Sequence, residues 1–216
     1  MNILTKEQLI FLNHFKLSEL AKYFYLTGGT ALSAFYLKHR YSYDLDFFTE
    51  EKESLDINNI IVFLKSIPNL NSISYEKIYD RRIFFINING KNLKIEFTFY
   101  PFKNIAKRIT ADGLNIDSFE DIFVNKIAAI SDRKETKDLI DLYFILEKKG
   151  VSYILWGVEK AKEKFGIDGL QYIIQRRLIN PPENLEDIPY LIKPIRNYRK
   201  LFEKAVIELT KRYFKE

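Results

Sequence analysis

The sequence predicts an α+β fold, with a mixed sheet flanked by helices in residues 1–115 and a helical bundle in residues 116–216. Two observations predict it. Three runs between residues 72 and 100 are rich in strand-forming residues, and in the last of them apolar residues at odd positions alternate with polar residues at even positions, which is typical of a strand that buries one face. From Ser118 onward the apolar residues recur with a period of about 3.6, which is typical of helices that pack together.

The first half is expected to mix helices and strands. Helical spacing over residues 5–24 predicts two short helices that break near Lys16. The sequence Asn-Gly-Lys-Asn at 89–92 is a strong hairpin signal. The other predicted elements are a short strand at 26–27, a helix at 29–38, a strand at 44–49, a helix at 54–66 that Pro68 stops, and strands at 72–79, 83–89 and 93–100.

The second half is expected to be helical throughout. The sequence Ser-Phe-Glu-Asp at 118–121 has the pattern of a capping box and precedes an apolar periodic run. Gly150 is suited to end a helix. The predicted helices span residues 122–130, 139–149, 152–164, 169–178 and 194–214, and the domain boundary is expected near residues 110–117.

Composition excludes several kinds of site. The 216 residues are 47% apolar, which is enough for a substantial core. There is no cysteine, so disulfides, zinc–thiolate sites and cysteine nucleophiles are excluded. The first residues lack a small-residue cleavage site, and no apolar run approaches the roughly 18 residues of a membrane span. We therefore expect a cytoplasmic protein with no membrane partner.

The charge balance is modestly basic, with a net charge of +5 and a pI of about 9.1. The excess is uneven, because residues 196–216 hold seven Lys or Arg against three Glu. Two interpretations stay open. The charge indicates an anionic partner such as a nucleotide or RNA, or it is the solvated face of a lysine-rich helix.

The most informative stretch is residues 26–48. Gly28 and Gly29 stand at the start of a predicted helix, where unobstructed backbone N–H groups and the helix N-terminus favour a phosphate. The alternative is that a tight strand-to-helix turn needs glycine for its backbone conformation alone. Asp44 and Asp46 follow in a predicted strand, where side chains two residues apart leave the same face.

These carboxylates predict a metal site. Two convergent carboxylates can share a hard cation, and Mg²⁺ (or Mn²⁺) is normally held by one or two carboxylates together with the phosphates of a substrate. Because the neighbours of Asp44 and Asp46 are apolar, a buried pair without a cation would be costly. Glu96 is the candidate third carboxylate, and its alternative is a solvent-facing strand glutamate beside Lys94.

Four sequence motifs together resemble a known family. They read GGTAL at 28–32, HRYSYDLDF at 39–47, NKIAA at 125–129 and DLIDLY at 138–143 with Arg133 before it. This combination looks like the AbiEii/AbiGii toxin family within the polymerase-β-like nucleotidyltransferase superfamily. The first half is thus expected to be a nucleotidyltransferase-like domain. One departure is that the superfamily usually has Gly-Ser at the phosphate turn, where this chain has Gly-Gly followed by Thr30.

The resemblance implies a reaction and its participants. A nucleoside monophosphate would pass from an NTP to an acceptor hydroxyl of RNA (tRNA) or of a protein, and an antitoxin would be a partner. The metal would lie on Asp44 and Asp46, and a carboxylate oxygen of these residues or of Glu96 would assist deprotonation. The nucleotide would lie near the motif residues Gly28, Gly29, Thr30, Arg40 and Ser42.

Lys126 and Asp138 are the candidate residues of the second half. Lys126 follows an apolar helical row, so its ammonium either contacts the triphosphate or simply reaches solvent past apolar neighbours. Asp138 shares a helix side with Asp141 at i, i+3, and either takes a direct role or stabilises the first turn of its helix. His39 is expected to be structural or to line the substrate site rather than to be catalytic.

Two other functional classes stay open. One is a catalytically inactive module that binds a nucleotide or an antitoxin. The other is a nucleotidyltransferase for small molecules, of the kind that modifies antibiotics.

Overall fold

The computed structural model describes residues 3–214, and the chain divides into two compact units. The first comprises Met1–Tyr36 and Tyr41–Ser118, and the second comprises Leu37–Arg40 and Phe119–Glu216. Four residues from the N-terminal half of the sequence are thus part of the otherwise C-terminal helical unit.

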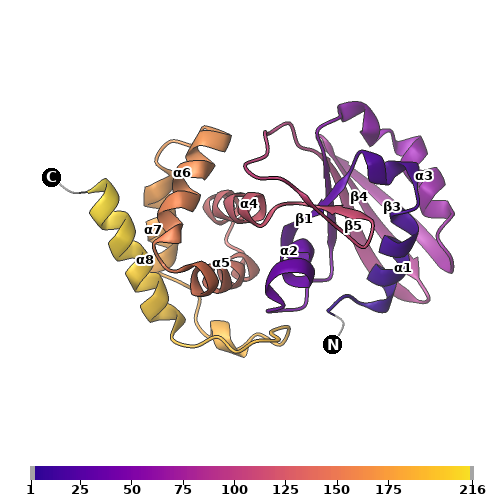
Figure 1. Cartoon of the computed structure of the whole chain (residues 1–216). Coiled ribbons are helices and arrows are strands. Elements are labelled where there is room, and N and C mark those ends of the chain that lie inside the picture. The colour runs from indigo at the N-terminus through magenta and orange to yellow at the C-terminus, as the bar shows by residue number, and fades with distance from the viewer. Residues whose placement is uncertain (1–2, 215–216) are drawn as a thin grey trace. The chain divides into compact units, whose positions relative to one another are not determined.

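A seven-stranded mixed sheet forms the first unit, in the order β3-β4-β5-β2-β1-β7-β6 (Figure 1). The pairs β2–β5 and β1–β7 are parallel and the other pairs are antiparallel. This confirms the predicted α+β class. The strands are β1 Tyr25–Thr27, β2 Leu45–Thr49, β3 Leu70–Ile78, β4 Arg81–Ile88, β5 Lys91–Phe99, β6 Ile109–Ala111 and β7 Leu114–Ile116.

Two helices, α1 (Lys6–Phe15) and α3 (Ile57–Lys65), cover one face of this sheet (Figure 1). Their phenylalanines pack against the sheet, with the ring centroids of Phe15 and Phe47 4.3 Å apart. Burial alternates along β2, so that Leu45, Phe47 and Thr49 point into this core. The intervening Asp46 therefore points to the opposite face.

That opposite face carries α2 (Gly28–Ala31), which continues as the π-helix η2 (Leu32–Leu37) (Figure 1). The helix was predicted over residues 29–38, but its change of winding was not. A π-helical stretch is rare and often occurs at functional sites. The first unit also contains the 3₁₀ helices η1 Glu19–Lys22 and η3 Lys52–Leu55.

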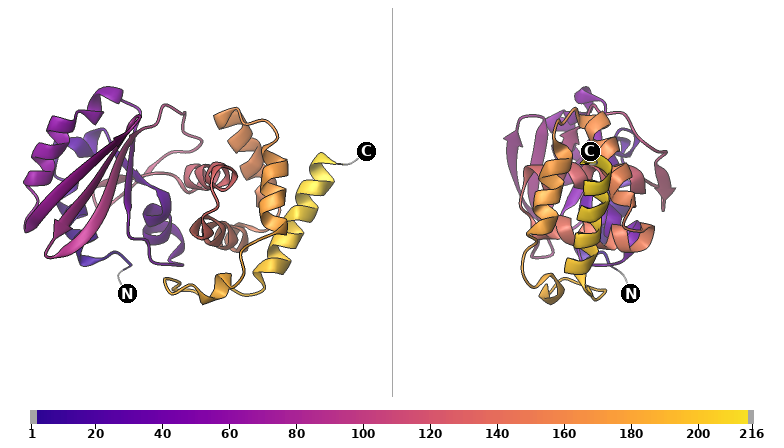
Figure 2. Two further views of the ribbon diagram at one scale, coloured as in Figure 1. Left: turned by 180° about the vertical axis from the view of Figure 1, so that it is seen from behind. Right: turned by 90° about the vertical axis from the view of Figure 1, so that its left-hand side faces the viewer.

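The second unit is a bundle, as predicted. Its helices pack closely, since a Cβ on Gly157 of α6 would lie 2.4 Å from the ring of Phe123 on α4. The C-terminal helix α8 lies beside α6 and α7 (Figure 2). The helices are α4 Phe119–Asp132, α5 Thr136–Lys149, α6 Tyr153–Phe165, α7 Leu170–Ile179, η4 Leu185–Asp187 and α8 Tyr198–Tyr213.

Some element boundaries differ from those expected. The short hairpin β6–β7 lies in the segment that was interpreted as the domain boundary. The last helix begins at Tyr198 rather than Pro194, because Asn197 before it has a left-handed backbone with φ of +52°. Among residues 3–214, no helix combines the length and the apolar character that crossing a bilayer requires.

Candidate active site

Asp46 lies in the middle of the sheet, between two strands that place polar residues beside it. Thr27 of β1 is its antiparallel partner and Glu96 of β5 is its parallel partner. Paired residues on neighbouring strands are about 5 Å apart and point to the same face. The sheet thus places the second and third predicted carboxylates side by side.

Gly28 is the residue that lets the helix begin beside Asp46. Its φ of +72° is in the left-handed region, and a Cβ built on it would lie 2.3 Å from the Oδ2 atom of Asp46. The carboxylate of Asp46 therefore occupies the space that any other residue would fill at position 28. The predicted glycine bend and the second aspartate are in direct contact.

The first turn of α2 has no side-chain cap. Thr27 is its N-cap residue, but the Thr27 hydroxyl donates to Oδ2 of the buried Asp117 at 2.7 Å. The first N–H groups of a helix have no partner within the helix, and they favour an anion. Gly28 and Gly29 supply two of these N–H groups.

Thr30 fixes the segment that carries the first aspartate. Its buried hydroxyl donates to the backbone carbonyl of Asp44 at 2.5 Å. Two residues earlier, the carbonyl of Ser42 accepts from Nε2 of the buried Gln8 at 2.9 Å. The backbone that enters β2 is thus held both to α2 and to α1, and this role of Thr30 was not predicted.

Asp44 directly precedes β2 and remains accessible. Its side chain is 38% exposed, and Nζ of Lys94 lies 3.8 Å from its Oδ2. Among residues 3–214, no three His, Asp or Glu side chains form a cluster that could hold a metal ion by themselves. The available pair, Asp44 and Asp46, nevertheless fits Mg²⁺, which takes its other ligands from substrate phosphates and water.

Glu96 is engaged by an arginine. Nε and Nη2 of Arg81 donate to its two carboxylate oxygens at 2.5 and 2.6 Å, and the Thr98 hydroxyl donates at 2.8 Å. Burial raises the pKa of Glu96, but the hydrogen bonds from Arg81 and Thr98 outweigh it and leave the pKa below its usual value. Arg81 was not among the predicted residues.

In the second unit, the buried Asp141 gathers three basic side chains. Nε and Nη2 of Arg40 donate to its two oxygens at 2.7 and 2.9 Å. Nε2 of His39 and Nζ of Lys126 each lie 2.7 Å from an Asp141 oxygen. Burial raises the pKa of Asp141, but Lys126 and Arg40 outweigh it and hold that pKa well below its usual value.

Asp138 extends this cluster at the start of α5. It accepts from Nζ of Lys126 at 2.8 Å and from Nε of Arg133 at 2.8 Å. Burial lowers the pKa of Lys126, but Asp141 and Asp138 outweigh it and raise that pKa. The Lys126 ammonium is thus ionised, almost fully buried and already balanced by two carboxylates.

The predicted site residues fall into two groups. The first unit holds those expected to bind the metal and the phosphates: Gly28, Gly29, Thr30, Ser42, Asp44, Asp46 and Glu96. The second unit holds Arg40, Lys126 and Asp138, all of them in the ion cluster around Asp141. The i, i+3 spacing of Asp138 and Asp141 was the sequence signal for this cluster, but the centre of the cluster is Asp141.

Known proteins share this fold. The chain is 33% identical over 131 residues to an uncharacterized protein of Aquifex aeolicus, a match that spans 59% of each chain, so it covers less than two thirds of that relative. JHP933 of Helicobacter pylori has a similar structure, with a TM-score of 0.54 at 22% identity, over 96% of this chain and 92% of that one. MenT4, a nucleotidyltransferase toxin of Mycobacterium tuberculosis, has a TM-score of 0.58 at 14% identity, over 94% and 83% of the two chains.

The family model described as nucleotidyl transferase AbiEii toxin, type IV toxin–antitoxin system, matches residues 10–212. This range contains the glycine bend, the sheet carboxylates and the ion cluster described above. The resemblance found in the sequence motifs is therefore confirmed, and the chain belongs to the AbiEii nucleotidyl transferase toxin family.

Proposed function

We propose that this protein transfers a nucleoside monophosphate from an NTP to an acceptor hydroxyl of a macromolecule, RNA such as tRNA or a protein. We further propose that it is a toxin whose activity an antitoxin counteracts, and that it acts in the cytoplasm. The family to which the chain belongs supports nucleotidyl transfer and the role of a toxin with an antitoxin. The single observation that carries the reaction is the contact between the Asp46 carboxylate and the glycine that opens α2.

Asp44 and Asp46 are proposed to hold Mg²⁺ (or Mn²⁺). Bound there, the metal would neutralise charge on the phosphates and on the attacking oxygen. Glu96 is proposed as the third carboxylate, although Arg81 now donates to both of its oxygens, so it must exchange one of these hydrogen bonds to bind a metal. The lowered pKa of Glu96 makes it a poor proton acceptor.

The first turn of α2 is proposed to bind the triphosphate through the backbone N–H groups of Gly28 and Gly29. Thr30 would act indirectly, because its hydroxyl fixes the backbone of Asp44. The acceptor oxygen would then attack the α-phosphorus in line, the bond from the α-phosphorus to the bridging oxygen would break, and pyrophosphate would leave. The acceptor proton would pass to a carboxylate of the site.

The nucleotide-binding or catalytic roles of Arg40, Lys126 and Asp138 remain predictions. All three are tied into the ion cluster around Asp141. Contact between Lys126 and a triphosphate would require its ammonium to exchange Asp138 or Asp141 for a phosphate oxygen. Within their own unit, these residues are positioned by one another.

The test is a transfer assay with NTPs labelled at the α-phosphate. Each NTP is incubated with Mg²⁺ and, in separate arms, with a tRNA pool, a protein extract and a set of small hydroxylated antibiotics. We expect label to enter the tRNA or protein arm and Asp46→Asn to lower the rate by about 100-fold or more. Asp112→Asn is the matched control, because Asp112 is an exposed carboxylate whose ion-pair partner, within residues 3–214, is Lys16 alone.

The three arms separate the alternatives. Transfer to the antibiotics alone would replace the proposed acceptor with a small molecule. If no acceptor becomes labelled but the protein binds the nucleotide tightly, the protein is an inactive binding module. Equal rates for Asp46→Asn and Asp112→Asn would contradict the proposed site.

A further inference from the structure

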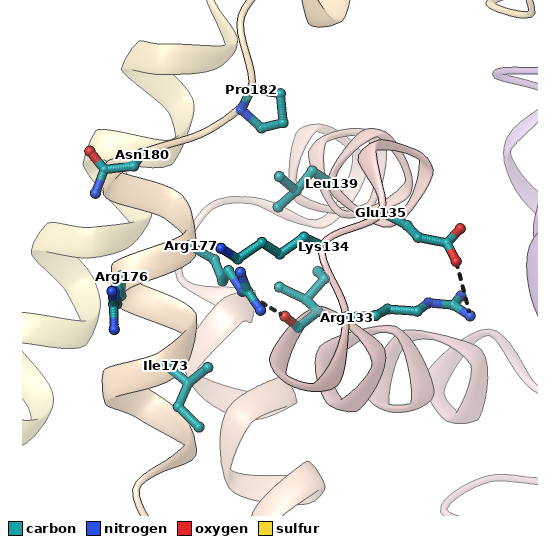
Figure 3. Close-up of a pocket in the computed structure, with 10 residues that line it drawn as sticks. Arg133, Lys134, Glu135, Leu139, Ile173, Arg176, Arg177, Asn180 and Pro182 are labelled. Atoms are coloured by element: carbon teal, nitrogen blue, oxygen red, sulfur yellow. Dashed lines mark hydrogen bonds and ion pairs between the residues drawn. The ribbon is translucent and has the colours of Figure 1, made fainter.

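A pocket of about 440 Å³ lies in the second unit, between the α4–α5 turn and the C-terminal part of α7 (Figure 3). Its volume is within the range of roughly 300–1,000 Å³ that is usual for sites that bind small ligands. Four of its lining side chains are basic: Arg133, Lys134, Arg176 and Arg177.

Three of these cations are available to a ligand. Arg133 pairs with Glu135 at 3.6 Å, and both side chains point away from α7 (Figure 3). Lys134, in contrast, reaches from the α4–α5 turn toward α7 (Figure 3). Within residues 3–214, no carboxylate lies within ion-pair distance of Lys134, Arg176 or Arg177.

Arg177 is held in place. Its Nε donates to the carbonyl of Ile130 at 3.1 Å, in the last turn of α4, where carbonyls lack partners within the helix. The guanidinium is therefore anchored by one nitrogen, and its two terminal nitrogens remain for a bidentate contact. Arg176 and Lys134 are exposed beside it.

Glu135, which pairs with Arg133, also lines the pocket, and most of the remaining lining is apolar. Ile130, Leu139, Ile173 and Pro182 contribute to the walls, and the amide of Asn180 is the polar uncharged group. Ile173 is 37% exposed, so part of its side chain is accessible to a ligand. A ligand that suits this lining combines a flat apolar body with a strong negative charge.

The distribution of charge in the chain agrees with an anionic ligand. The second unit holds 21 Lys and Arg against 16 Asp and Glu, whereas the first holds 13 of each. The whole net charge of +5 is therefore carried by the unit that contains this pocket. Such a field raises the local concentration of phosphates.

We infer that the pocket between the α4–α5 turn and α7 binds a nucleotide, with its phosphate on Lys134, Arg176 and Arg177 and its base against the apolar side chains of the lining. Arginine guanidinium groups bind phosphates bidentately, as they do carboxylates, and they also stack on bases, which a carboxylate side chain of a protein partner does not offer. The nucleotide is either free or one unit of a single-stranded RNA.

The binding is tested without transfer chemistry. The whole protein is titrated in EDTA, so that no Mg²⁺ supports the proposed active site, with AMP in one arm and a short fluorescein-labelled single-stranded RNA in the other. Arg176→Glu and Lys134→Glu alter the pocket from two different elements. Lys204→Glu is the matched control, because Lys204 is an exposed lysine of α8 with no carboxylate within ion-pair distance in the described chain.

We expect both pocket variants to weaken binding by about tenfold, and Lys204→Glu to change it by less than about twofold. Loss in both arms identifies the nucleotide as the unit that is bound, and loss in the RNA arm alone identifies RNA as its source. Equal weakening by all three variants would mean non-specific attraction and would overturn the inference. Displacement of the RNA by polyglutamate as effectively as by unlabelled RNA would overturn it in favour of an acidic protein partner.

This result is separable from that of the transfer assay. Asp46→Asn is expected to leave RNA binding in EDTA unchanged, since Asp46 does not line the pocket. If transfer fails while the pocket still binds RNA, only the proposed reaction is contradicted. If transfer occurs while the pocket variants bind RNA normally, only the assignment of the pocket is contradicted.

Discussion

Gly28 contributes two separate properties to the candidate active site. Its backbone is left-handed, and its missing Cβ leaves room for the Asp46 carboxylate. Gly90 shares the first property, with φ of +80°, but a Cβ on it would meet nothing within 4 Å. Comparing alanine substitutions at Gly28 and Gly90 therefore separates the energetic cost of the positive φ from the damage to the active site.

We predict that Gly28→Ala and Gly90→Ala each lower the free energy of unfolding by about 1 kcal/mol or more, because alanine disfavours a positive φ. Only Gly28→Ala should also abolish nucleotidyl transfer, because its Cβ displaces Asp46. Chemical denaturation and the transfer assay are the measurements. Full activity of Gly28→Ala would show that Asp46 is not needed in its present position.

Between elements, the hydroxyl of Thr30 joins the first turn of α2 to the segment that enters β2. We predict that Thr30→Val, which keeps the shape of the side chain, lowers the free energy of unfolding by about 1–2 kcal/mol, because the carbonyl of Asp44 loses its donor. The affinity for Mg²⁺–NTP should fall in parallel, as measured by calorimetry. Unchanged affinity would mean that Asp44 keeps its position without this bond.

The sequence predicts which residues each element contains better than it predicts which other elements those residues contact. Local spacing is enough to place Asp44, Asp46 and the glycine bend in one strand–helix–strand unit, and to assign the fold class and the family. The pairing of Asp46 with Glu96 depends on the register of two parallel strands that are far apart in the chain. The contact between Arg81 and Glu96 depends on the register of the β4–β5 hairpin, in which Arg81 is opposite Thr98.

The second unit shows the same limit at longer range. His39 and Arg40 follow the predicted helix at 29–38 and give no local signal that they contact α5. Both side chains contact α5 because they hydrogen-bond to the buried carboxylate of Asp141, about a hundred residues later. A buried carboxylate and its cations must be brought together by tertiary folding, so local sequence patterns do not reveal their partners.

At the scale of the whole molecule, the ion cluster around Asp141 is expected to decide stability. We predict that Asp141→Asn lowers the free energy of unfolding by about 3–5 kcal/mol, because Arg40 and Lys126 lose a fully buried counter-ion. Asp168→Asn, at an exposed loop position, is the control and should change stability little. Equal unfolding midpoints in urea would contradict a central role for Asp141.

The same cluster predicts a pH dependence. Burial lowers the pKa of His39 below its usual 6.5, only partly opposed by Asp141. The unfolded chain therefore binds a proton that the folded chain does not, and stability should fall by up to about 1.4 kcal/mol per pH unit as the pH drops below 6.5. A second loss should follow below pH 3.8, where the lowered pKa values of Asp138 and Asp141 matter.

Urea unfolding between pH 8 and pH 5 measures the first of these losses. His14→Gln should retain it, because His14 lies in the first unit, where it contacts Ser66 and Phe63. His39→Gln should remove it. A flat profile in the unaltered protein would mean that His39 is protonated equally in the folded and unfolded states.

The proposed reaction depends most on the binding of a metal–nucleotide complex by Asp44 and Asp46 beside Gly28. Isothermal titration of the protein with Mg²⁺ and an NTP, repeated on Asp44→Asn and on the exposed-site control Asp112→Asn, measures this directly. We predict that Asp44→Asn weakens the affinity by about tenfold or more while Asp112→Asn leaves it unchanged. Equal affinities in all three proteins would contradict the assignment of these aspartates as the metal site.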